Sequence, residues 1–199
     1  MVILLTAFEP FNHQAENASL DVLNHLDFQH VGVTIERVVL PVVYQDAIYR
    51  TLLLKFRPDV VLLMGEAATR QQICLEHRAM NVKKATIADN AGKLYSGEPI
   101  DEDGPLQRHD TIDSASIVAS LALRGYPIAL SESAGMFICN MAMYQTLAEV
   151  HKLGLSTKVG FIHWPRLSHQ INPPGMPTID LSVAVATLAE ILKTIIEKK

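Results

Sequence analysis

Short runs of consecutive apolar residues, each ended by a turn-forming residue, recur along the chain. The clearest runs cover residues 2–6, 59–64 and 158–163, and each is typical of a strand that is buried on both faces of a sheet. Residues 33–40 instead alternate apolar and polar positions, as a strand does when only one of its faces is buried. A further short strand is expected over residues 126–131. Together these runs predict the strands of one central sheet.

Amphipathic stretches lie between the predicted strands. Apolar residues recur every three or four positions after an Asn17 cap, over residues 44–56, 111–123 and 180–196, and in the stretch from Cys139 to Gly154. Strands that alternate with helices predict a three-layer α/β/α sandwich around a mostly parallel, twisted sheet. We expect residues 1–199 to form a single domain.

Residues 70–109 break this alternation. Residues 73–82 alternate well enough to be a strand, with Cys74, Glu76 and Arg78 on one face. The stretch from 84 to 109 is rich in Asp, Asn, Gly and Pro and reads as a long loop, which is more often functional than idle inside a compact domain. We therefore expect an antiparallel excursion on one edge of the sheet.

Composition narrows the function. A net charge of −4, with no basic cluster before Lys198 and Lys199, argues against nucleic acid as a partner. The apolar run at residues 2–5 is too short for a signal peptide or a membrane span. Cys74 and Cys139 show no metal or disulfide spacing, and the histidines show no spacing typical of a metal site. We expect a cytoplasmic protein with reduced thiols, no metal and no membrane partner.

Cys139 is the first candidate for chemistry. It follows the predicted strand at 126–131 and a segment of small residues that includes Gly135, so it lies in about the first turn of a helix. Free backbone N–H groups and the helix dipole stabilise negative charge there, and the thiolate is the nucleophilic form of cysteine. The alternative is that Cys139 is a small buried apolar residue, the commoner fate of a free cysteine.

His163 and Glu76 are the candidates for a base and for the group that orients it. His163 ends a buried strand, and the neighbouring carboxyl ends of two strands would bring it close to Cys139. The alternatives are a hydrogen-bonded core histidine and a solvated or Arg78-paired glutamate. Phe8 and Phe11 follow the first strand and either cap the core or line a pocket beyond the strand ends.

Short motifs, each weak alone, occur in one order along nearly the whole chain. They are Thr6-Ala7-Phe8-Glu9-Pro10-Phe11 with Asn17 and Ser19, Leu40-Pro41-Val42, Gly65-Glu66-Ala67 with Arg70, Leu75-Glu76 with Ala79-Met80-Asn81, Asp89-Asn90, Ala134-Gly135-Met136-Phe137-Ile138-Cys139-Asn140, and Gly160-Phe161-Ile162-His163. Through them the chain resembles the pyroglutamyl peptidase type I family of cysteine peptidases. The resemblance implies Cys139 as nucleophile, His163 as base and Glu76 as third member, in removal of an N-terminal pyroglutamyl residue without a metal or cofactor.

The same resemblance implies a binding site and partners. Phe8, Phe11, Phe137 and Ile138 would wall a slot for the flat, uncharged five-membered lactam, with Glu66 beside it. A free N-terminus carries an ammonium that such a slot would not desolvate. The implied partners are peptides with a blocked N-terminus and further copies of the chain, as a homo-oligomer and by family resemblance a tetramer.

Several positions depart from the family pattern. Glu66 stands where Gln is usual, Thr86 where Arg is usual, and Arg166 where an aromatic residue is common. These departures lie around the pocket more than around the proposed triad. They leave two alternatives open: a related thiol amidase that prefers another small N-terminal acyl group because of Glu66, and a non-catalytic binder of a lactam or peptide end on the same fold.

Overall fold

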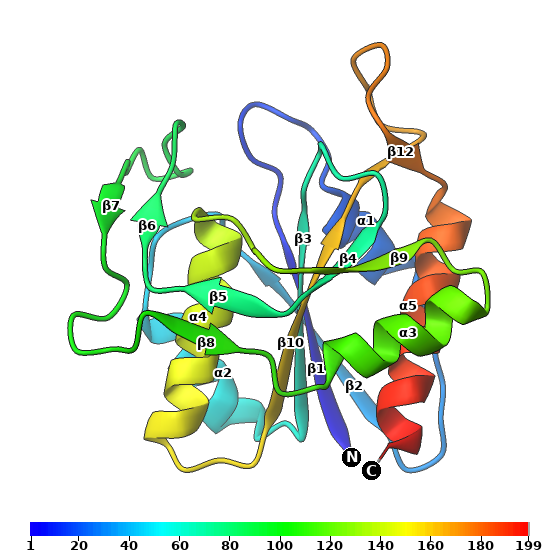
Figure 1. The fold of residues 1–199 in the computed structure, drawn as a ribbon, viewed down its shortest axis with the longest axis horizontal. Coiled ribbons are helices and arrows are strands. Elements are labelled where there is room, and N and C mark those ends of the chain that lie inside the picture. Colours follow the sequence, from blue (N-terminus) through cyan, green and yellow to red (C-terminus); the bar gives the residue numbers. More distant parts are fainter. Residues whose placement is uncertain (199) are drawn as a thin grey trace.

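A six-stranded sheet forms the centre of the molecule in the computed structural model, which describes residues 1–198 (Figure 1). Its strand order is β2-β1-β3-β10-β4-β9. The strands are β1 (Val2–Phe8), β2 (Thr34–Leu40), β3 (Val60–Glu66), β4 (Ile73–Glu76), β9 (Ile128–Ser131) and β10 (Lys158–Trp164). All neighbours are parallel except β10 and β4, which run antiparallel. The predicted strands and the mostly parallel sheet are therefore confirmed.

Helices cover both faces of the sheet and complete the predicted three layers (Figure 1). The helices are α1 (Ala18–His25), α2 (Ala47–Phe56), α3 (Ser114–Leu123), α4 (Ile138–Lys152) and α5 (Leu181–Glu197). Buried side chains of α1, α3 and α5 pack in one core, and those of α2 and α4 pack in the other. The two cores follow from strand geometry, because successive strand residues such as Ile3 and Leu4 point to opposite faces.

Asn17 begins α1 as the sequence predicts. Its side chain accepts a hydrogen bond from the Ser19 backbone N–H at 3.0 Å and so satisfies one of the free donors of the first turn. The Asn17 amide also donates to the Glu9 carbonyl at 3.1 Å. The start of α1 is thereby tied to the loop that leaves β1.

The alternation at residues 73–82 predicted a single strand, and this prediction is wrong. It divides at His77 into β4 and β5 (Arg78–Met80), and β5 pairs antiparallel with β8 (Gln107–His109) outside the central sheet. The His77 backbone makes the switch, since its N–H donates to Ser131 while its carbonyl accepts from Asp110. The excursion also contains a hairpin of β6 (Lys83–Lys84) and β7 (Ser96–Glu98). The expected antiparallel excursion is confirmed, but its strands are shorter than predicted.

Two short strands complete the fold. β11 (Arg166–Leu167) follows β10 directly and pairs in parallel with β12 (Thr178–Ile179), which leads into α5. No helix among residues 1–198 is both long enough and apolar enough to span a lipid bilayer.

Candidate active site

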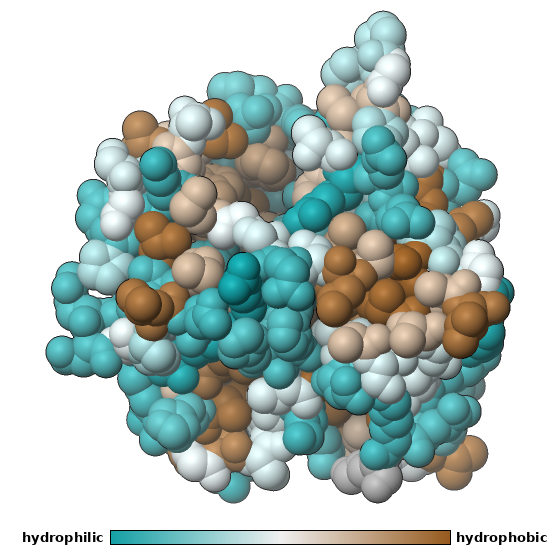
Figure 2. Space-filling view, viewed as in Figure 1, coloured by the Kyte–Doolittle hydropathy of each residue, from teal (hydrophilic) through white to brown (hydrophobic). Residues whose placement is uncertain are grey.

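A cavity of about 190 Å³ opens where β3 and β10 end. Its walls include the aromatic and aliphatic side chains that the sequence singled out, and they also include the thiol and the imidazole: Phe8, Phe11, Phe137, Ile138, Cys139 and His163. Figure 2 shows this face hollowed above the sheet, with apolar side chains visible inside the hollow. The structure therefore brings the predicted nucleophile, base and slot residues to one place.

Cys139 lies in the first turn of α4, as expected. The N-cap residue is Phe137, whose side chain makes no capping hydrogen bond, so the first backbone N–H groups of α4 have no side-chain acceptor from that residue. Gly135 has a φ of +78°, a left-handed conformation that glycine adopts without strain, and it turns the chain into the helix. On the facing strand, Gly65 leaves space for the thiol, because a Cβ at Gly65 would lie 2.7 Å from Cys139 Sγ.

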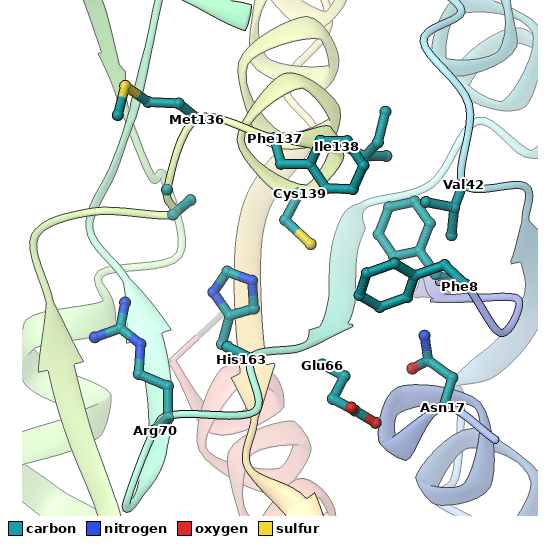
Figure 3. A pocket seen from close by; sticks show the side chains of 14 residues that line it. Phe8, Asn17, Val42, Glu66, Arg70, Met136, Phe137, Ile138, Cys139 and His163 are labelled. Carbon is teal, nitrogen blue, oxygen red and sulfur yellow. The ribbon is translucent and has the colours of Figure 1, made fainter. Parts of the chain in front are cut away.

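His163 lies between the thiol and a buried carboxylate. Its Nδ1 is 2.7 Å from Glu76 Oε1, and an ionised carboxylate only accepts, so Nδ1 donates and Nε2 is left for the cavity. Figure 3 shows the Cys139 sulfur directed toward the His163 ring. Burial alone would lower the pKa of His163, but the negative charge of Cys139, its hydrogen bond and the Glu76 carboxylate together raise that pKa from 6.5 to about 9.

The route that brings Cys139 to His163 differs from the sequence argument. β9 is not the neighbour of β10, because β4 lies between them, and β9 runs antiparallel to β10. Residues 132–137 lead from β9 to α4, and α4 packs across the face of the sheet against β3 and β10. The helix start, rather than a neighbouring strand end, delivers the thiol.

Arg70 is a functional candidate that the sequence analysis did not single out. Its Nη2 donates to Glu76 Oε1 at 3.1 Å, to Ser131 Oγ at 2.9 Å and to the Ser133 carbonyl at 2.9 Å. It also lines the cavity. One guanidinium thus joins the carboxylate behind His163 to the segment that precedes α4. The sequence signal that could have identified Arg70 was its place in the motif with Gly65-Glu66-Ala67. Its hydrogen-bond partners could not be read from the sequence, because Ser131 and Ser133 lie far along the chain.

Loops packed against one another hold the aromatic walls. Phe11 lies in the loop after β1, and its ring centroid is 6.3 Å from that of Phe137 at the start of α4. Asn90 in the excursion donates to Glu9 Oε1 at 2.7 Å and to the Pro10 carbonyl at 3.1 Å. The excursion therefore supports the loop that carries Phe11. The length of the excursion indicated that it has a function, but not which one.

Glu66 lines the cavity, but its carboxylate points toward α1 and away from Cys139 and His163 (Figure 3). Its Oε2 accepts from the Ala18 backbone N–H at 2.8 Å and from Gln170 Nε2 at 3.0 Å. Its Oε1 lies 3.9 Å from Arg166 Nε. The resemblance implies Glu66 beside the lactam, and the structure gives this carboxylate partners from the protein itself.

Cys74, the other cysteine, has a different environment. It is buried, its thiol lies 3.4 Å from the Gln72 carbonyl, and burial raises its pKa. Cys74 is thus a packed core thiol. Among residues 1–198, no three His, Cys, Asp or Glu side chains are grouped so that they could hold a metal ion.

Comparison with known proteins gives one consistent result. The pyroglutamyl peptidase family model matches residues 1–198. The pyrrolidone-carboxylate peptidase of Thermoanaerobacter sp. is 36% identical over 201 residues, covering 100% of this chain and 99% of the relative. The corresponding protein of Thermococcus onnurineus is 34% identical over 196 residues, covering 98% of each.

Solved structures agree with the sequence relatives. A mutant pyrrolidone carboxyl peptidase from P. furiosus superimposes with a TM-score of 0.92 at 29% identity, covering 100% of this chain and 99% of that one. Pyroglutamyl peptidase I from Bacillus amyloliquefaciens gives a TM-score of 0.88 at 30% identity, covering 96% of this chain and 94% of that one. With a family model matched along its whole described length, the chain belongs to the pyroglutamyl peptidase family.

Proposed function

We propose that this chain hydrolyses the bond after an N-terminal pyroglutamyl residue of peptides, with Cys139 as nucleophile, His163 as acid and base, and Glu76 as the group that orients His163. Membership of the pyroglutamyl peptidase family supports the reaction. One observation carries the residue assignment: a thiol in the open first turn of a helix faces a buried imidazole whose other nitrogen is 2.7 Å from a carboxylate.

The raised pKa of His163 sets the starting state. Because the ring holds a proton through neutral pH, His163 presents a cation to the Cys139 sulfur, and the thiolate is the nucleophilic form of cysteine. The thiolate attacks the pyroglutamyl carbonyl and forms a carbon–sulfur bond. Backbone N–H groups at the start of α4 stabilise the oxyanion, since Phe137 supplies no side-chain cap for them.

Collapse of this intermediate releases the peptide. The carbon–nitrogen bond breaks as His163 gives its proton to the leaving amine, and pyroglutamate remains as a thioester on Cys139. His163, now neutral, takes a proton from water, whose oxygen attacks the thioester. The carbon–sulfur bond then breaks, pyroglutamate leaves, and the proton taken from water stays on His163 beside the Cys139 thiolate.

The slot selects the first residue of the substrate. Phe8 and Ile138 are almost fully buried, and Phe11 and Phe137 complete an apolar wall beside Cys139. A flat, uncharged lactam loses little on leaving water for such a wall, whereas a free α-ammonium would lose its hydration without a partner. The substrates are therefore peptides with a cyclised, uncharged N-terminus.

A pair of cysteine variants tests this assignment. Cys139→Ala should abolish amine release from a pyroglutamyl-amide reporter, while Cys74→Ala should retain turnover within about threefold because Cys74 is a packed core thiol. Iodoacetamide at neutral pH should modify Cys139 far faster than Cys74. Undiminished turnover by Cys139→Ala would refute the role of Cys139, and slow labelling of Cys139 would favour a non-catalytic binder.

We also infer, from its length and composition, that the chain is one cooperative domain and that it acts in the cytoplasm. We further infer that it self-associates, as its family resemblance implies. Leu94 and Leu106 in the excursion are 56% and 83% exposed, and a contact between copies would cover them. Sedimentation of the wild type beside Leu106→Glu tests self-association, with a smaller species expected for the variant. A single thermal transition tests the domain, and cell fractionation tests the compartment.

A further inference from the structure

Two opposite charges are buried together beside the cavity. Glu66 is the last residue of β3, and it pairs in register with Trp164, two residues before Arg166. Glu66 is 9% exposed and Arg166 is 7% exposed. Their closest charged atoms, Oε1 and Nε, are 3.9 Å apart. The two side chains therefore form an ion pair that is largely withdrawn from water.

Each member of this pair has few other ways to offset its charge. Arg166 Nη2 donates to the Ile171 carbonyl at 3.2 Å, but the buried Nε has no hydrogen-bond partner. The Glu66 carboxylate accepts neutral N–H groups from Ala18 and Gln170. Hydrogen bonds from neutral donors orient a carboxylate without cancelling its charge, so Arg166 is the charge that balances Glu66 at this position.

The balance matters because Glu66 also lines the substrate cavity. Apolar walls of this cavity are formed by Phe8, Phe11, Phe137 and Ile138. The electrostatic attraction of an unbalanced charge is strong where water is excluded. A carboxylate without Arg166 would attract a cationic N-terminus into the slot. With Arg166 in place, the same wall is electrically neutral and favours an uncharged ring.

We propose that Arg166 is a specificity-determining residue: by pairing with Glu66 it keeps the slot neutral, so that the enzyme accepts the uncharged pyroglutamyl ring and rejects the cationic ring of an N-terminal proline. The two rings have the same size and differ in one carbonyl and in charge. This inference rests on the proposed function, because it concerns the choice of acyl group at the same thiol.

Two reporters that share one leaving group test the proposal, pyroglutamyl-amide and prolyl-amide. The measured quantity is the ratio of their kcat/KM values in the wild type and in Arg166→Met, Glu66→Gln and the double variant Glu66→Gln/Arg166→Met. Arg166→Met should lower pyroglutamyl turnover. It should also lower the ratio of kcat/KM for pyroglutamyl-amide to that for prolyl-amide by at least about tenfold, because an unbalanced carboxylate favours the cationic prolyl ring. Glu66→Gln leaves an unbalanced positive charge and should leave the preference for pyroglutamyl intact or greater.

The double variant separates a charge effect from a folding effect. Removing both charges should restore the wild-type ratio within about threefold, and Arg166→Lys should also keep it, because the charge is retained. A ratio unchanged in Arg166→Met, or a double variant no better than Arg166→Met, would overturn the proposal. If Arg166→Met alone fails to fold, the double variant still decides, since the proposal expects it to fold and to discriminate.

The proposed function is judged separately. Pyroglutamyl turnover by the wild type that is lost in Cys139→Ala supports the reaction whatever the ratios show. Absence of that turnover in the wild type would reject the reaction and the role of Arg166 with it, whereas an unchanged ratio in Arg166→Met would overturn the role of Arg166 alone.

Discussion

Gly65 lies opposite the thiol, and adding one methyl group there should slow catalysis strongly without removing any chemical group. A Cβ at Gly65 would lie 2.7 Å from Cys139 Sγ and 3.1 Å from Phe161 Cζ. Favourable contacts between such atoms occur at about 3.5–4.0 Å. The methyl of Gly65→Ala is therefore confined between the sulfur and a buried ring, and the sulfur or the strand must move by about 1 Å.

The expected loss follows from that displacement. A reacting atom misplaced by about 1 Å can cost about 100-fold in rate, so kcat for Gly65→Ala should fall by about that factor. Overpacking of a buried site should also cost about 1–3 kcal/mol of stability. Activity and stability must therefore be measured together, so that loss of folded protein is not mistaken for loss of chemistry.

Gly160 supplies the matched control. It lies in β10, on the opposite face of the sheet, and a Cβ there would collide with Ile112 rather than with the thiol. Gly160→Ala should lose stability by a similar amount but keep kcat within about threefold per folded molecule. Steady-state kinetics, thermal unfolding and the rate of iodoacetamide labelling compare the two variants. Equal kcat in both, or unimpaired labelling in Gly65→Ala, would refute the assigned position of the thiol.

Four further outcomes are expected at and around the thiol–imidazole pair. Because its pKa is raised to about 9, His163 stays protonated below that pH, so turnover should fall as pH rises through about 9; a rate that stays flat to pH 10 would contradict the assigned proton. The same raised pKa contributes stability that is present below pH 6.5 and is lost through about 9. Glu76→Gln should lower kcat by about 100-fold or more, because an amide does not hold the charged ring, and near wild-type kinetics would exclude that role. Arg70→Met should lower kcat about tenfold through misplacement of Glu76, whereas Arg78→Met, similarly exposed but bonded to Glu132 and Gln107 rather than to Glu76, should not; equal effects would remove Arg70 from the site.

The central strands could be predicted from the sequence because they are buried on both faces. The polar residues of the runs at 2–6 and 158–163 lie only at their ends, at Thr6, Lys158 and His163, so the rest of each run can only be buried. Their carboxyl ends could also be predicted as the place of the site, and Phe8 and His163 do lie at those ends and line the cavity. Local pattern was sufficient wherever burial alone decided the structure.

Pairing between distant segments could not be predicted in this way. The alternation at 73–82 suits one long strand, but the chain leaves the sheet at His77 because β5 finds its partner in β8, far along the sequence. Glu66 and Arg166 were each recognised as unusual, yet nothing in the sequence shows that they are partners. Only the register of β3 with β10 brings the two charges together.

The antiparallel placement of β4 explains how Glu76 reaches His163. Strand residues two apart point to the same face, so His163 shares with Phe161 the face that α4 covers. Cys74 lies directly opposite His163 in the ladder, and Glu76, two residues further, therefore points to that same face and reaches the ring diagonally. A shift of β4 by one residue would turn Glu76 to the other face and replace it with an apolar or solvent-facing side chain. The contact between His163 and Glu76 thus depends on the register of a single short strand. Arg70 bonds Glu76 at the end of that strand and the Ser133 carbonyl just beyond the neighbouring end of β9, so it is placed where it can fix that register.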